Sequence, residues 1–183
     1  MSNYRVCLMA LSRRFTALDL TYLGVVAAVC GVIFALTWNV YFIGSALGGP
    51  IAARILSYGL WFIGAPLAAT LIKKPGAAFL GEFLGALVET IIPTYGAFTN
   101  LIYGFAQGIA SELAYAIFRY RRFGIINASL SGAFAGFPCV ALDALLFGDV
   151  FPPNVMVLIT IAAVVSGAVY GAIAALAVRS VKR

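Results

Sequence analysis

Two long stretches of the chain, residues 20–43 and 155–178, contain no charged residue. Each exceeds the roughly 20 residues that a helix needs to cross about 30 Å of hydrocarbon. The whole chain of 183 residues is 63% hydrophobic and only 10% charged, with a mean hydropathy of +1.05. These values lie far from those of a soluble domain, so the sequence predicts an all-α integral membrane protein.

Hydropathy, with glycine, proline and charge marking the ends, divides the chain into six predicted transmembrane helices. We expect a single membrane domain, 1–183, folded as a compact bundle with spans at about 19–43, 50–72, 76–92, 94–118, 125–147 and 153–178. The connections between these spans are short. They leave no room for a soluble catalytic domain, so the function is expected to lie within the membrane.

Lysine and arginine occur at alternate ends of the predicted spans. They are Arg5, Arg13, Arg14, Lys73, Lys74, Arg119, Arg121, Arg122, Arg179, Lys182 and Arg183. The other three connections carry Asp149 and no basic residue. By the positive-inside rule, both termini are expected to be cytoplasmic. The net charge of +6 is therefore a topology signal, and we expect no nucleic-acid partner.

Small residues recur at a spacing of four, which places them on one helix face and lets helix backbones approach closely. Five Gly-x-x-x-Gly pairs begin at Gly44, Gly81, Gly104, Gly132 and Gly167. The first span adds a stripe of small residues, Ala27, Gly31 and Ala35. Such a stripe either packs inside the bundle or forms a docking face for a partner membrane protein, and the spacing alone leaves both open.

Polar side chains gather in the outer half of the predicted bundle. Glu82 lies near the middle of the third span, and Glu89 follows seven residues later on the same helix face, at about 1.5 Å of rise per residue. Asn100, Tyr103 and Gln107 form a stripe on the fourth span. Lipid cannot solvate such groups, so they are expected to face the bundle interior or a watery cavity.

Trp38, Tyr58, Trp61 and Asp143 fall in the same outer half, and Arg54 is the only basic residue well inside a span. We therefore expect an outward-facing pocket lined by aromatic rings and carboxylates. One arginine cannot neutralise all the buried carboxylates, so either some are protonated or a cation completes the site. Two alternatives remain: Trp38 belongs to the interfacial aromatic belt, or Asp143 pairs structurally with Arg54.

The sequence contains no histidine, and its three cysteines, Cys7, Cys30 and Cys139, lack a metal-ligand spacing. We therefore expect no metal site and no cofactor, and we interpret Cys30 and Cys139 as apolar packing residues.

The third and fourth spans read GEFLGALVETIIPTYGAFTNLIYGFAQGIASELAYAIFRYRRF, from Gly81 to Phe123. This block, with six short spans and a small-residue stripe on the first, resembles the S component of an energy-coupling factor (ECF) vitamin transporter. More specifically, it is similar to the YkoE family, associated with thiamine or its hydroxymethylpyrimidine precursor. The resemblance covers most of residues 20–178.

The resemblance implies a substrate-capture subunit in the prokaryotic cytoplasmic membrane. Its implied partners are a vitamin ligand, a transmembrane coupling subunit and ATPase subunits that hydrolyse ATP, so the chain itself is not expected to be an enzyme. The family docks through an Ala-x-x-x-Ala face on the first helix, which corresponds to Ala27, Gly31 and Ala35 here. The implied ligand suits the residues that we expect to line the pocket, which offer acceptors for an amine or cation and rings for stacking. The expected ligand-binding residues are Glu89, Glu82, Gln107, Asn100, Tyr103, Trp38, Tyr58, Trp61 and Asp143. The residues do not distinguish thiamine from hydroxymethylpyrimidine.

Two other classes of function compete with this hypothesis. A self-sufficient cation or proton-coupled carrier would use Glu82, Glu89 and Glu112 as a relay, but the sequence shows no obvious inverted repeat. A membrane enzyme is disfavoured because the chain has no histidine, nucleophile elbow or phosphate loop.

Overall fold

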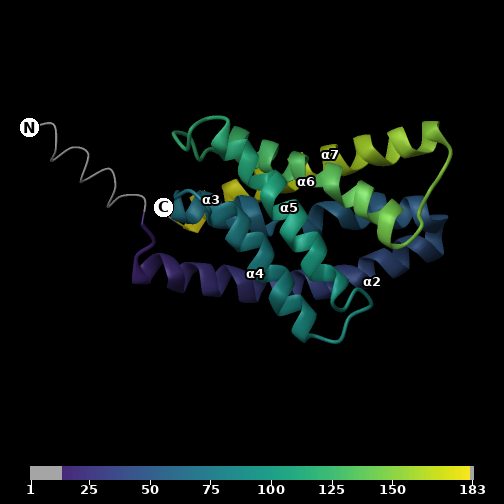
Figure 1. Cartoon of the computed structure of the whole chain (residues 1–183), viewed down its shortest axis with the longest axis horizontal. Helices are drawn as coiled ribbons and strands as arrows, with labels where there is room; N and C mark the ends of the chain where they lie inside the picture. The colour runs from purple at the N-terminus through teal and green to yellow at the C-terminus, as the bar shows by residue number, and fades with distance from the viewer. Residues whose placement is uncertain (1–13, 182–183) are drawn as a thin grey trace, which may run out of the picture.

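The computed structural model describes residues 14–181, which form helices and connections and no strand. The helices, labelled in Figure 1, are α2 (Ala17–Trp61), α3 (Gly64–Ile72), α4 (Ala77–Ile91), α5 (Thr99–Ala116), α6 (Ile125–Leu146) and α7 (Pro153–Val181). The all-α prediction is therefore confirmed for this part of the chain. Arg5, Cys7, Arg13, Lys182 and Arg183 lie outside the described residues.

Helix α2 folds back on itself. In Figure 1 it runs out in purple and returns in blue beside α7. The reversal uses two residues with non-helical backbone, Gly48 and Gly49. Gly49 has φ of 70°, a left-handed conformation that glycine adopts without steric cost. Pro50 then opens the returning segment, where a missing N–H is tolerated. The two arms meet closely, since a Cβ added to Gly44 would lie 2.7 Å from the Cα of Ala53.

This tight reversal corrects the predicted number of helices. Residues 17–72 form one nearly continuous helical stretch, so α4, α5, α6 and α7 bring the count of such stretches among residues 14–181 to five rather than six. Three stretches in this part of the chain are long and apolar enough to cross a membrane: Ala17–Ile72, Ile125–Leu146 and Pro153–Ser180. Helix α4 is too short for that criterion at 15 residues, and α5 is too polar.

The ends of α2 follow local sequence signals. Thr16 caps the N-terminus: its hydroxyl accepts the N–H of Asp19 at 3.3 Å, and the Asp19 carboxylate accepts the N–H of Thr16 at 2.6 Å. This is the reciprocal capping box, which satisfies two otherwise unpaired backbone donors. At the other end, α2 stops at Trp61, and α3 begins only at Gly64.

Several connections that carry basic residues lie at one end of the bundle. Lys74, in the turn before α4, donates to the carboxylate of Asp19 at the start of α2. Glu112, near the end of α5, accepts the N–H of Gly76 at 2.6 Å and that of Phe79 at 3.0 Å. Glu112 therefore caps the N-terminus of α4 from a neighbouring helix. Figure 1 shows the C-terminal end of α7 near α3 at this same end.

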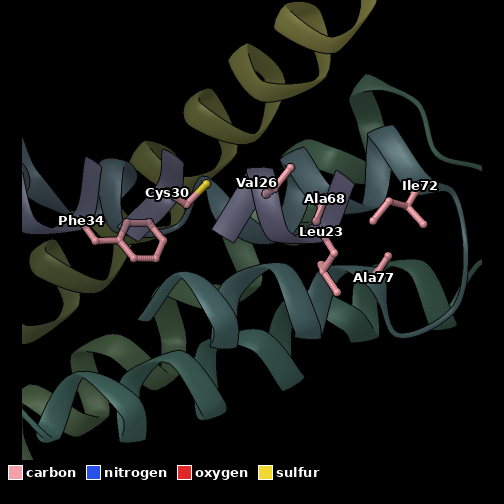
Figure 2. Packing of buried hydrophobic residues seen from close by; sticks show 7 residues of the cluster. All are labelled: Leu23, Val26, Cys30, Phe34, Ala68, Ile72 and Ala77. Carbon is pink, nitrogen blue, oxygen red and sulfur yellow. The ribbon is translucent and has the colours of Figure 1, made fainter. Parts of the chain in front are cut away.

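The core between α2, α3 and α4 is small and apolar. Figure 2 shows its seven buried residues: Leu23, Val26, Cys30, Phe34, Ala68, Ile72 and Ala77. Cys30 and Cys139 are both buried and free, as expected for packing residues.

The predicted glycine pairs mark close helix contacts. A Cβ on Gly132 of α6 would collide with the carbonyl oxygen of Gly167 on α7, and one on Gly81 of α4 would lie 2.8 Å from the carbonyl oxygen of Gly64 on α3. Backbones that approach this closely require glycine at the contact. The second contact presses α4 against the start of α3, and so it fixes the depth of Glu82, the next residue.

Candidate functional site

A cavity of about 230 Å³ lies between α2, α4, α5 and α6. This volume is near the lower end of the roughly 300–1,000 Å³ typical of small-molecule sites, so the cavity suits a small ligand. Its walls include all nine residues predicted to bind substrate: Glu89, Glu82, Gln107, Asn100, Tyr103, Trp38, Tyr58, Trp61 and Asp143. The structure thus brings these residues together, while their contact with a ligand stays a prediction.

One wall of the cavity is aromatic. The ring of Trp38 lies 5.0 Å from that of Trp61 and 5.4 Å from that of Tyr95, measured between centroids. Tyr41 lies 5.7 Å from Trp38 in an edge-on arrangement. Trp38 therefore lines the cavity, and the alternative that it serves only as an interfacial belt residue is not what the structure shows. Such a wall can stack on a flat ring or hold a cation over its faces.

Glu89 stands beside this wall. Its side chain is 3% exposed, and its Oε1 atom accepts the indole N–H of Trp38 at 2.9 Å. No lysine or arginine of residues 14–181 lies within ion-pair distance of Glu89. The indole of Trp61 is a second neutral donor to this carboxylate. A nearly buried carboxylate with only neutral donors is costly unless a proton or a cation accompanies it. Glu89 is therefore suited to bind a positively charged or amine-bearing group.

Glu82 forms the floor of the cavity. It lies on the same side of α4 as Glu89, about two helical turns away. It is 1% exposed, and its Oε2 atom accepts the backbone N–H of Ala65 at 2.8 Å. Its other oxygen, Oε1, has no protein hydrogen-bond partner. Glu82 and Glu89 thus share one helix face, as their spacing predicted, but they meet different surroundings.

Asp143, in contrast, is held by three donors. The hydroxyls of Tyr58 and Tyr103 each donate to its carboxylate at 2.6 Å, and the Nε of Arg54 lies 3.3 Å from Oδ2. Arg54 also pairs with Asp149, just beyond α6. The alternative that Asp143 pairs structurally with Arg54 is therefore realised. Both tyrosine hydroxyls are engaged by this carboxylate and are less free to bind a ligand.

The cavity carries a surplus of negative charge. Among the described residues that line it, four are acidic (Glu82, Glu89, Asp143 and Asp149) and Arg54 alone is basic. Since Arg54 is bound to the two aspartates, the unbalanced carboxylates are those of α4.

Two amides complete the wall on α5. Gln107 is 3% exposed, and Asn100 is 6% exposed and donates to the hydroxyl of Thr94 at 3.2 Å. An amide offers both a donor and an acceptor, which matches the edge of a nitrogen heterocycle. Within residues 14–181, no group of three or more His, Cys, Asp or Glu side chains could hold a metal ion.

Several cavity residues were not among the predicted ligand contacts. They are Phe34, Tyr41, Arg54, Ala86, Tyr95, Gly104, Cys139, Phe147 and Asp149. Tyr95 and Asp149 lie in connections, where no helical period indicates the direction of a side chain. Tyr41 carried a usable signal, because it follows Trp38 by three residues and so lies on nearly the same face of α2.

The predicted docking stripe is placed differently from expectation. Ala27 is 5% exposed, and Gly31 is buried so closely against α4 that a Cβ would collide with Val88. Ala35 is only half-buried. This stripe therefore packs mainly inside the bundle, because its small residues let α2 approach α4. The exposed small residues of this segment are instead Gly24 and Ala28.

Comparisons with known proteins agree with this architecture. The family described as "ABC-type cobalt transport system, permease component" matches residues 18–138. YkoE of Bacillus subtilis (strain 168), whose name refers to an HMP/thiamine permease, is 26% identical over 151 residues, covering 82% of this chain and 75% of its own length.

A solved structure of an S-component of an ECF transporter superposes with a TM-score of 0.83 at 25% identity. The match covers 92% of this chain and 84% of that one. The resemblance to an ECF S component is thereby confirmed, and the protein is a multi-pass protein of the cell membrane. Because the matched family spans well over half of its residues, the chain belongs to the family of permease components of ABC-type cobalt transport systems.

Proposed function

We propose that this protein is the substrate-capture subunit of an ECF importer and binds thiamine or its hydroxymethylpyrimidine precursor in the cavity. One observation carries the proposal: Glu89, buried and without a basic partner, stands beside an aromatic wall. The likeness to an ECF S component and to a protein named as an HMP/thiamine permease supports the class of ligand.

The chemistry of thiamine matches the cavity part by part. Its thiazolium is permanently cationic and suits Glu89 and the faces of Trp38 and Trp61. Its aminopyrimidine is flat and carries donors and acceptors, which suit the amides of Asn100 and Gln107. A cobalt ion would be a poor substrate for this cavity, because cobalt usually takes imidazole or thiolate ligands and the chain has no histidine.

The cavity is proposed to open to the outside. We propose that the two arms of α2, the second continued by α3, each cross the membrane, so that the five helical stretches of residues 14–181 make six crossings and both termini are cytoplasmic. The basic connections at one end of the bundle support this orientation, since positive charge favours the cytoplasmic side. Asp143 and Asp149 line the cavity and lie at the C-terminal end of α6 or just beyond it. The basic connection before Gly124 lies at the N-terminal end of the same helix.

Transport is proposed to require a transmembrane coupling subunit and ATPase subunits, which hydrolyse the ATP. The proposed docking face on α2 contains Gly24 and Ala28, which keep the family's spacing of four and are exposed. A Cβ added to Gly24 would meet nothing within 4 Å, so this surface is open to a partner helix. Small residues at such a face let helix backbones come close.

The rival carrier hypothesis loses support from the position of Glu112. Its carboxylate accepts two backbone N–H groups at the start of α4 and does not line the cavity. A relay through Glu82, Glu89 and Glu112 would therefore have to release a helix cap at each step.

The proposal is tested by calorimetric titration of the protein in lipid nanodiscs with thiamine and with hydroxymethylpyrimidine. Both tryptophans of the chain line the cavity, so quenching of their fluorescence gives an independent measure. We expect saturable binding of at least one of the two ligands and none of choline, a cation without the pyrimidine. Absence of binding to both would refute the proposal.

A further inference from the structure

The returning arm of α2 is interrupted beside the cavity. Helix α2 ends at Trp61, and α3 begins at Gly64 after a short break. The first N–H groups of a new helix have no partner within that helix and must be satisfied from elsewhere. The N-cap residue of α3, Ile63, provides no side-chain hydrogen bond.

Glu82 supplies the missing acceptor from another helix. Its Oε2 atom accepts the N–H of Ala65, in the first turn of α3, at 2.8 Å. The fit is close, because a Cβ on Gly64 would lie only 2.9 Å from the same oxygen. Glu82 is 1% exposed, so water does not compete for this bond. The carboxylate thus acts as an N-cap in trans for α3.

This contact separates the two glutamates of α4 electrostatically. The N-terminus of a helix carries partial positive charge, which compensates a carboxylate placed against it. Glu82 has that compensation from α3. Glu89 is instead hydrogen-bonded by neutral indole N–H groups, those of Trp38 and Trp61. A ligand cation therefore gains more from Glu89 than from Glu82.

The same break orients an aromatic ring of the site. Trp61, the last residue of α2, donates its indole N–H to the carbonyl oxygen of Phe34 at 3.2 Å and lies 5.0 Å from Trp38. If α3 lost its cap, the residues before it would lose their fixed backbone, and Trp61 would move with them.

We infer that Glu82 is a positioning residue, which caps α3 from α4 and thereby holds Trp61 on the cavity wall, while Glu89 meets the charge of the ligand. This inference rests on the proposed function for the identity of the ligand, and on the contacts of Glu82 alone for the positioning.

The test compares Glu82→Gln, Glu82→Ala and Glu89→Gln in nanodiscs, each titrated with cationic thiamine and neutral hydroxymethylpyrimidine. A glutamine oxygen can still accept the Ala65 N–H, whereas alanine cannot.

Glu82→Ala is expected to raise the dissociation constants of both ligands by about tenfold, the size of a lost cap. Glu82→Gln should raise both by one and the same smaller factor, and Glu89→Gln should affect thiamine selectively. A selective loss of thiamine binding in Glu82→Gln would overturn the inference, because Glu82 would then meet the ligand charge.

A second readout needs no ligand. In a Trp38→Phe background, Trp61 is the only tryptophan of the chain, so its emission reports its surroundings. We expect Glu82→Ala to shift this emission to longer wavelength and Glu82→Gln to restore most of the parent spectrum. An unchanged spectrum in a folded Glu82→Ala protein would refute the positioning role. If the wild-type protein bound neither ligand, the proposed function would fail, and this spectrum would still decide the role of Glu82.

Discussion

The indole N–H of Trp38 donates to the carboxylate of Glu89 at 2.9 Å and so joins α2 to α4 beside the aromatic wall of the cavity. The bond holds a buried carboxylate next to the packed rings of Trp38 and Trp61. A cation placed there would meet a charge and a π face at once, two attractions that reinforce each other away from water.

Glu89→Gln is therefore expected to weaken thiamine binding by about tenfold to a hundredfold, the equivalent of the ~1.5–3 kcal/mol typical of a hydrogen bond to a charged group. Hydroxymethylpyrimidine lacks the cation and should lose far less. Calorimetric titration of both ligands measures the difference. Equal losses for the two ligands would show that Glu89 does not meet the cationic group.

Arg54 is expected to be essential for stability. It is nearly buried and pairs with both Asp143 and Asp149, so Arg54→Met would leave two carboxylates without their cation. Breaking a buried ion pair from one side typically costs about 3–5 kcal/mol. Thermal unfolding in detergent, followed by tryptophan fluorescence, should show a clearly lower midpoint.

The matched control for Arg54 is the double variant Arg54→Met/Asp143→Asn, in which the unpaired charge is removed as well. Its midpoint should recover part of the loss, because the amide oxygen of asparagine can still accept one of the two tyrosine hydroxyls, and its NH2 group can donate to the oxygen of the other. No recovery would indicate that Arg54 stabilises the fold through its packing or its pair with Asp149 instead.

Helical spacing predicted much of the site. Glu82 and Glu89 are seven residues apart, and Asn100, Tyr103 and Gln107 follow each other at three and four, so each set had to share a face. The cost of leaving polar groups in lipid then turned those faces inward. The structure brings both sets to one cavity. Their roles toward a ligand depend on partners from other helices, such as Ala65 for Glu82, which no local pattern reveals.

The remaining differences have physical causes as well. Small residues such as Ala27 and Gly31 suit a buried helix contact and an exposed docking face equally, so their spacing could not decide between the two. The reversal at Gly48 and Gly49 needs only two non-helical residues, and the sequence predicted a longer connection there. The break before Gly64 was missed within an apolar span, although the glycine and the nearby Pro66 are the usual signals of a helix start.

The contact between α6 and α7 should tolerate no side chain at its closest point. A Cβ on Gly132 would collide with the backbone of Gly167, so Gly132→Ala must push the helices apart, at a cost of about 1–3 kcal/mol. Gly24→Ala is the matched control, because a Cβ there meets nothing within 4 Å. Thermal midpoints should fall for Gly132→Ala and stay level or rise for Gly24→Ala, since alanine favours a helix. A Gly132→Ala protein as stable as the control would contradict the close packing.

The proposed docking face on α2 predicts a separation of ligand binding from assembly. Gly24→Leu and Ala28→Leu add bulk to an exposed face that lies outside the cavity, so the isolated subunit should bind thiamine with nearly wild-type affinity. Both variants should nevertheless fail to copurify with the coupling and ATPase subunits, because the larger side chains keep the partner helix away.

Ala177→Leu, at an exposed position on α7, controls for the effect of added bulk. Copurification is measured by pulling down a tagged coupling subunit, and transport by uptake of labelled thiamine into proteoliposomes that contain the whole complex. Complexes of normal composition with Gly24→Leu and Ala28→Leu would place the docking face elsewhere on the bundle.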